Sequence, residues 1–172
     1  MKDLAWKVLA RAVAHPLVAN WLIRRSQRTP YMHLPGYMRR FWIFNGYDHE
    51  TRVKRFPRLP SIRIHHILRE DRAAHLHSHP WDARTIILCG EYVERRRDVD
   101  LTAEFGFDVD VMHRRQPGDT ASLTPTDLHH IDSVSPGGVW TLFITWTDVG
   151  SWGFQVDSKL IDHHEYKATS RR

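Results

Sequence analysis

The sequence predicts a small all-β protein, a barrel or sandwich of short strands, with an N-terminal helical extension. From residue 61 onward, short alternating or apolar stretches are separated by turn residues, such as Pro-Gly-Asp at 117–119 and Ser-Pro-Gly-Gly at 135–138. Residues 1–28 instead carry apolar side chains at helical spacing. At 172 residues, the chain has the length of a single domain.

Residues 1–28 are expected to form an amphipathic helix that breaks or restarts at Pro16. Its apolar positions recur at helical spacing, at Leu4, Val8, Leu9, Ala12 and Val13. Trp6, Trp21 and the nearby arginines would also suit a membrane surface. We favour packing against the domain or against a partner subunit, and we therefore expect a homodimer.

The next segment leads from the helical extension into the strands. An aromatic run occupies 37–44, and the polar stretch 45–60, which contains Asn-Gly and two prolines, is expected to be a loop. We therefore divide the chain into a helical extension (1–36), a barrel domain (37–160) and a polar C-terminal tail (161–172).

The expected strands after residue 60 are, in chain order, 61–69, 75–79, 84–89, 91–97, 107–115, 120–124, 129–134 and 139–147. The first of them alternates, so that Ile62 and Ile64 share one face while Arg63 and His65 share the other. Which of these two faces points into the barrel stays open at this point.

The composition is that of an ordinary globular protein, with 41% hydrophobic and 26% charged residues. The net charge of +5 makes the surface basic, but no RNA-recognition sheet motif accompanies it, so we do not expect nucleic acid as a partner. The single cysteine, Cys89, cannot form a disulfide within the chain. A reducing compartment, the cytoplasm, is therefore expected, and we see neither a secretory signal nor a transmembrane run.

Histidines are unusually frequent, and the chain has 13 of them. Three alternate along one expected strand, at His75, His77 and His79. Residues two apart on a strand point to the same side, about 7 Å apart along the chain, so their imidazoles can converge on one metal ion. Buried imidazoles otherwise each need a hydrogen-bond partner, and we therefore predict a metal site completed by a histidine from a neighbouring strand.

The segment HLHSHPWDARTIILCGEY at 75–92 resembles the first signature of the cupin superfamily. His77 and His79 correspond to its His-x-His pair and Gly90 to its glycine turn. The resemblance implies an antiparallel double-stranded β-helix, the jelly-roll barrel of cupins. It also implies one divalent transition metal, for which we favour Fe(II), with Mn, Ni or Zn as alternatives.

The second cupin signature leaves two candidates for the third ligand. Counting from its glycine, Gly118, gives His129, whereas counting from Pro125 gives His130. We favour His129, because it shares the inward parity of the aliphatic residue at 131. His130 and His75 remain in reserve.

One expected cupin ligand is missing from the sequence. In most metal cupins a glutamate follows the His-x-His pair after three or four intervening residues, and this chain has Ala83 and Arg84 at those positions. Asp82 stands one position early and is the candidate substitute. Its alternative role is that of a turn residue that binds nearby backbone amides.

A narrower resemblance is to a group of small, single-domain, RmlC-like cupins from bacteria and their phages, whose function is uncharacterised. The His-Pro-Trp-Asp run at 79–82 and the Trp-Gly-Phe run at 152–154 carry this resemblance. It covers residues 37–155 and leaves the N-terminal helix unexplained.

The substrate is expected to be a small and anionic molecule. Arg63, His65 and Arg84 are the candidate binding residues, since a guanidinium binds carboxylate or phosphate through two parallel hydrogen bonds. The sequence predicts a metal-dependent enzyme, an oxygenase or an isomerase or lyase. The alternatives are a non-catalytic binder of small ligands and a metal-stabilised structural or assembly protein.

Overall fold

The computed structural model describes residues 2–48, 50–51, 53–147, 150–157 and 159–169. The larger sheet has the order β1-β2-β8-β3-β6, formed by Met38–Phe44, Ser61–Ile67, Val139–Thr145, Ala83–Cys89 and Thr120–Leu123. A second sheet has the order β5-β4-β7, formed by Asp110–Arg115, Tyr92–Arg97 and His129–Val134. A separate hairpin pairs β9 (Gly153–Val156) with β10 (Lys159–Asp162).

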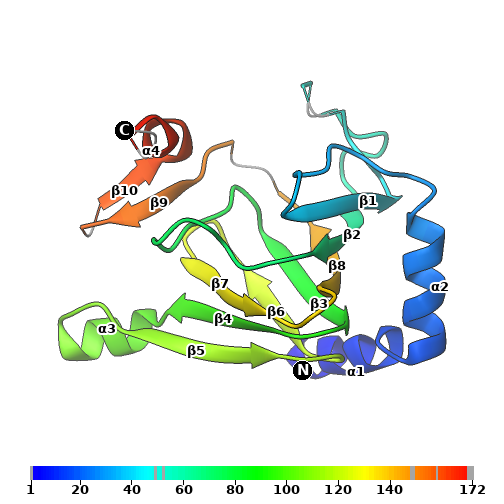
Figure 1. Cartoon of the computed structure of the whole chain (residues 1–172), viewed down its shortest axis with the longest axis horizontal. Coiled ribbons are helices and arrows are strands. Elements are labelled where there is room, and N and C mark those ends of the chain that lie inside the picture. Colours follow the sequence, from blue (N-terminus) through cyan, green and yellow to red (C-terminus); the bar gives the residue numbers. More distant parts are fainter. Residues whose placement is uncertain (1, 49, 52, 148–149, 158, 170–172) are drawn as a thin grey trace.

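The two larger sheets close around a common interior (Figure 1). At one end of it, Ile67 and Val139 from the larger sheet share a buried cluster with Tyr92 and Ile131 from the second sheet. The named strands pair antiparallel. The all-β jelly-roll prediction is confirmed.

Both faces of β2 are buried, which explains its mixed sequence. Ile64 points outward and packs under the N-terminal helices, while Arg63 and His65 point into the interior. These polar residues are 2% and 8% exposed. The predicted alternation of apolar and polar side chains along β2 is confirmed, and the face that carries Arg63 and His65 points inside.

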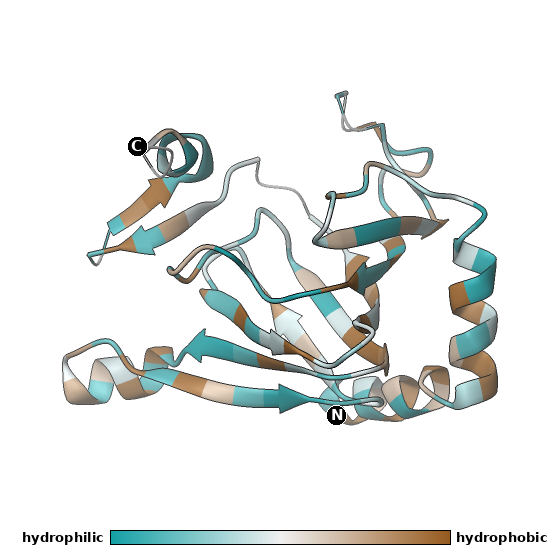
Figure 2. Cartoon of the chain, in the orientation of Figure 1, coloured by the Kyte–Doolittle hydropathy of each residue, from teal (hydrophilic) through white to brown (hydrophobic). Residues whose placement is uncertain are grey.

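The N-terminal helices, α1 (Lys2–Val13) and α2 (Pro16–Ser26), cover the outer face of the larger sheet. The break predicted at Pro16 is confirmed, because this residue opens α2, where its missing N–H costs no hydrogen bond. Ala10, Ala19 and Ile23 are buried against Ile64. Figure 2 shows hydrophobic and hydrophilic residues alternating along both helices. Their outer sides expose large apolar residues, among them Leu4, Val8, Leu17 and Trp21.

The predicted strand 75–79 is wrong as a strand. The segment is extended but meets its neighbours only in isolated bridges, from His77 to His129 on β7 and to Phe154 on β9. Two short partners, rather than one continuous strand, flank this segment. Its side-chain alternation survives, because the backbone there is still held on both sides by hydrogen bonds.

The structure contains elements that the sequence did not predict, namely α3 (Val99–Phe105), the β9–β10 hairpin and α4 (His163–Thr169). Helix α3 lies between β4 and β5, and the Asp98 carboxylate accepts a hydrogen bond from the Leu101 amide at its start. The segment predicted as a polar tail contains the end of β10 and α4, while residues 170–172 lie outside the described residues.

No helix in the described ranges is long and apolar enough to cross a membrane.

Candidate metal centre

Three histidines meet at one wall of the barrel interior. The backbones of His77 and His129 exchange two hydrogen bonds, of 2.9 and 3.0 Å, and this pairing aligns the segment carrying His79 beside β7. The ligand atoms of these three imidazoles all lie within 4.8 Å of one another. The Nε2 atoms of His79 and His129 are 2.8 Å apart. Two nitrogens bound at right angles to one ion, each about 2.1 Å from it, would be about 3 Å apart, so this spacing suits a shared metal.

Burial keeps the imidazoles of His77 and His79 in the form that binds metals. It lowers the pKa of His77 to about 3, with a further contribution from the neighbouring His129. Burial, together with the other two histidines, also holds the pKa of His79 well below its usual value. Neutral imidazole offers a lone pair to a metal ion, whereas protonated imidazole does not.

A buried carboxylate, Glu94 on β4, orients one of the three imidazoles. Its Oε1 atom accepts a hydrogen bond from Nδ1 of His129 at 2.8 Å, which directs the Nε2 atom of that ring toward His79. Arg96 and Arg115 each place Nε 3.0 Å from a Glu94 oxygen. Burial would raise the pKa of Glu94, but the hydrogen bond from His129 and the nearby charges of Arg96 and Arg115 lower it overall. Such carboxylate–histidine pairs are typical of metal sites.

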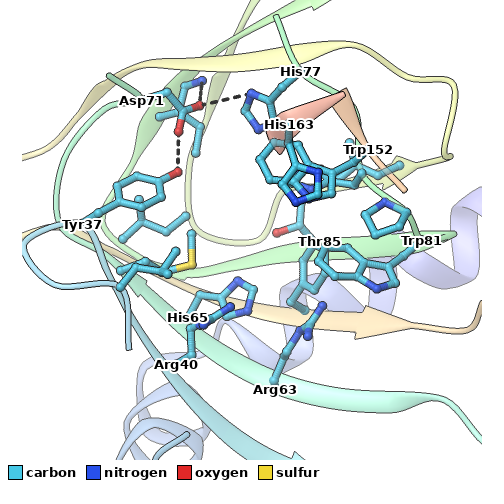
Figure 3. A pocket seen from close by; sticks show the side chains of 18 of the residues that line it. Tyr37, Arg40, Arg63, His65, Asp71, His77, Trp81, Thr85, Trp152 and His163 are labelled. Atoms are coloured by element: carbon cyan, nitrogen blue, oxygen red, sulfur yellow. Dashed lines mark hydrogen bonds and ion pairs between the residues drawn. The ribbon is translucent and has the colours of Figure 1, made fainter. Parts of the chain in front are cut away.

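Asp71 stands behind a second imidazole of the group. Its Oδ2 atom lies 4.0 Å from Nδ1 of His77 and accepts a hydrogen bond from the Ile131 amide at 2.8 Å (Figure 3). Its other oxygen accepts a hydrogen bond from the Tyr37 hydroxyl. Asp71 is thus a carboxylate held in place beside Nδ1 of His77.

The remaining candidate ligands lie elsewhere. His130 uses Nε2 to contact the Ala73 carbonyl oxygen at 2.6 Å and Nδ1 to contact Asp132. His75 contacts the Tyr166 hydroxyl at 2.9 Å. The Asp82 carboxylate accepts a hydrogen bond from the Thr147 hydroxyl at 2.7 Å. The structure therefore brings together His77, His79 and His129 but not Asp82, His130 or His75.

Of the three candidate substrate-binding residues, two line the interior and one does not. Arg84 lies on the outer face of β3, with its guanidinium carbon 4.8 Å from the Trp6 ring centre and a nitrogen 3.6 Å from Asp3. The prediction of Arg84 as a binding residue is corrected, because it is adjacent to the inward-facing Thr85 and successive residues of a strand point to opposite faces. Arg63 and His65 do line the interior (Figure 3).

The histidine group opens onto a cavity of about 670 Å³. Volumes of this size are usual for small-molecule sites. Aromatic rings flank the group, since His79 stacks on Trp81 with ring centres 5.4 Å apart and lies 6.4 Å from Trp152. His163 of α4 also lines the cavity, and its ring stacks on that of Trp152 with 4.5 Å between the ring centres.

Sequence reasoning missed two residues that support the histidines, Glu94 and Asp71. Glu94 directly precedes the arginine run at 95–97, and a carboxylate in such a charged stretch gives no sign of burial. In the structure Arg96 lies opposite His129 in the strand register, and Glu94 shares its face two residues earlier. The alternation of Tyr92, Glu94 and Arg96 places the three side chains on one face of β4. It points to the histidine group only once the pairing of β4 with β7 is known.

The sequence matches no family model and no curated protein. Among solved structures it is similar to vicilin from Corylus avellana (TM-score 0.56, 12% identity, 83% of this chain and 38% of that chain). It is also similar to oxalate decarboxylase from Bacillus subtilis (TM-score 0.54, 10% identity, 83% of this chain and 33% of that chain). The chain thus spans little more than a third of these proteins. Oxalate decarboxylase is a cupin, and the chain has the fold of the cupin superfamily.

Proposed function

We propose that the protein is a metal-dependent cupin enzyme, an oxygenase or an isomerase or lyase, that acts on a small anionic molecule. One observation carries this proposal: three buried or half-buried imidazoles converge on one point, and two of them, His77 and His79, line a cavity of about 670 Å³. A structural site is usually closed by four protein ligands, whereas a catalytic site keeps positions open toward the substrate.

The proposed ligands are His77, His79 and His129, and the proposed ion is a divalent transition metal. Imidazole suits Fe, Ni, Cu and Zn, and geometry and availability decide among such metals. We favour Fe(II), with Mn, Ni or Zn as alternatives. The similar oxalate decarboxylase has Mn(II) centres, which makes Mn(II) the first alternative to test.

The bound metal would supply Lewis acidity or an oxygen-binding position. The chain's own residues hold and shield that position. Glu94 keeps Nδ1 of His129 protonated, so that Nε2 carries the lone pair. The rings of Trp81 and Trp152 flank His79 and exclude water from that side.

A non-catalytic binding protein is the second candidate function. The single carboxylate that lines the cavity, among the described residues, is Asp71. It already accepts hydrogen bonds from Tyr37 and from the Ile131 amide, which leaves it poorly placed to move substrate protons. A site without such a base suits binding or metal-centred chemistry.

Oxygen consumption separates the two candidates. The full chain, loaded anaerobically with Fe(II), is mixed with air-saturated buffer and a panel of small carboxylic acids, and product formation is followed in parallel under nitrogen. An oxygenase consumes oxygen with one acid, and an isomerase or lyase changes an acid without oxygen. Neither activity should appear in His129→Ala. Binding of an acid without turnover by any metal-loaded form would contradict the enzyme proposal.

A further inference from the structure

Arg63 is a buried cation without an acidic partner. Its side chain belongs to β2 and is 2% exposed. Within the described ranges, no carboxylate forms an ion pair with it; its Nη1 atom donates instead to the hydroxyls of Tyr31, at 3.3 Å, and Tyr47, at 3.0 Å. Burying an uncompensated charge is costly, so a side chain of this kind calls for a functional explanation.

One edge of the Arg63 guanidinium has no hydrogen-bond acceptor. Its Nε and Nη2 atoms are both buried and both lack a partner. These two N–H groups lie side by side and point the same way, which is the fork that binds the two oxygens of a carboxylate. Aromatic rings pack against the same group, with the centre of Trp81 at 4.7 Å and that of Phe143 at 4.9 Å from its central carbon.

The charge of the cavity wall also favours an anion. Four permanently cationic side chains line the cavity, namely Arg40, Arg63, Arg72 and Lys167. They face one carboxylate in the described lining, Asp71, which is already engaged by Tyr37 and by the Ile131 amide. A ligand carrying negative charge would offset this excess.

We propose that Arg63 is the carboxylate-recognition residue of this cavity, binding one substrate carboxylate through Nε and Nη2 beside the histidine group. The Tyr31 and Tyr47 hydroxyls accept hydrogen bonds from Nη1 only, which leaves the Nε and Nη2 edge for the ligand. Trp81 links the two sites, because Arg63 and His79 lie 4.7 and 5.4 Å from the same ring. The inference rests on the proposed function, to which it adds the substrate class.

A carboxylate fits this place better than a phosphate does. The free edge of the guanidinium presents two parallel N–H groups, Nε and Nη2, which match the two oxygens of a flat carboxylate. A phosphate is tetrahedral, carries more charge and needs donors on several sides. Only this one fork is free on Arg63.

The test uses the full chain after metal removal with a chelator, so that an acid cannot bind through the metal. Isothermal titration calorimetry in chloride-free buffer compares benzoate and acetate with benzamide, the neutral isostere of benzoate, and with inorganic phosphate. We expect benzoate or acetate to bind, and Arg63→Gln and Arg63→Lys to weaken that binding about tenfold or more, since hydrogen bonds between charged groups are lost. Arg84→Gln replaces an arginine on the outer face of β3, in the same sheet, and should bind like the wild type.

Stability separates recognition from a structural role. A ligand-binding Arg63 without an acidic partner predicts that Arg63→Gln melts at the wild-type temperature or above it. Should that variant fail to fold, Arg63→Lys and the benzoate–benzamide comparison still decide. Equal binding of benzoate by Arg63→Gln, equal binding of benzamide, or preference for phosphate would overturn the inference.

The metal content of the same samples distinguishes this inference from the proposed function. Metal binding by a protein that binds neither benzoate nor acetate would overturn the carboxylate site alone. Benzoate binding that depends on Arg63, in a chain that takes up no metal, would support the site and overturn the proposed enzyme.

Discussion

The Glu94 carboxylate on β4 accepts a hydrogen bond from Nδ1 of His129 on β7 at 2.8 Å, with both side chains buried. This contact joins two neighbouring strands of the second sheet and fixes the tautomer of one proposed metal ligand. A ligand that is oriented before the metal arrives loses less freedom on binding it, so Glu94 is expected to act as a positioning residue.

Replacing Glu94 tests that role. Glu94→Gln should weaken metal affinity about 10- to 100-fold, because the amide no longer supports the imidazole as a negative charge does. It should also lower the free energy of unfolding by about 3 kcal/mol, since Arg96 and Arg115 lose a buried partner. Competition with a chelator of known affinity measures the first effect and urea unfolding the second. The exposed Glu91, paired with Arg114, gives the control Glu91→Gln, and equal metal affinity of the two variants would contradict the role.

Asp82 is predicted to be dispensable for metal binding. Its carboxylate is held by the Thr147 hydroxyl at 2.7 Å and does not join the histidine group. Asp82→Asn should therefore keep its metal and lose at most about 1 kcal/mol of stability, the usual value of one exposed hydrogen bond. Elemental analysis and thermal unfolding of this variant measure both effects. Loss of the metal would identify Asp82 as the fourth ligand.

Acid should destabilise the metal-free protein through His65. Burial, reinforced by the nearby charge of Arg63, holds the pKa of His65 well below its usual value of 6.5. Below about pH 6.5 the unfolded chain then binds a proton that the folded chain does not, so the free energy of unfolding falls as the pH falls. His65→Gln should reduce that slope by up to about 1.4 kcal/mol per pH unit. Urea unfolding at several pH values below and above 6.5 measures it, and identical slopes below 6.5 would refute the assignment.

The strongly patterned elements of this fold were predictable from the sequence. The bounds of β7, His129–Val134, agree with the predicted strand, and α2 begins at the predicted break, Pro16. Both carry local signals, a turn before and after the strand and a proline that cannot continue a helix. The short β9 and β10 and the helices α3 and α4 carry weaker ones, because such short elements depend on tertiary contacts.

The candidate site was predictable to the same extent. The alternation of His77 and His79 is local, and the resemblance to the cupin signatures supplied His129. Glu94 and Asp71 reach the group only through strand pairing and a loop contact, which the sequence does not encode locally. Arg84 was predicted to bind substrate but lies on the outer face of its strand, and nothing in the segment itself shows that α1 covers that side.

The metal content of the untagged full chain tests the central claim most directly. We expect elemental analysis to find about one divalent transition metal ion per chain, and His77→Ala, His79→Ala and His129→Ala each to lose it. His75→Ala and His130→Ala are matched controls, since these imidazoles point to Tyr166 and to Ala73, and both should keep the metal. A wild-type protein that takes up no metal under any loading condition, or a His77→Ala variant with full metal content, would contradict the account.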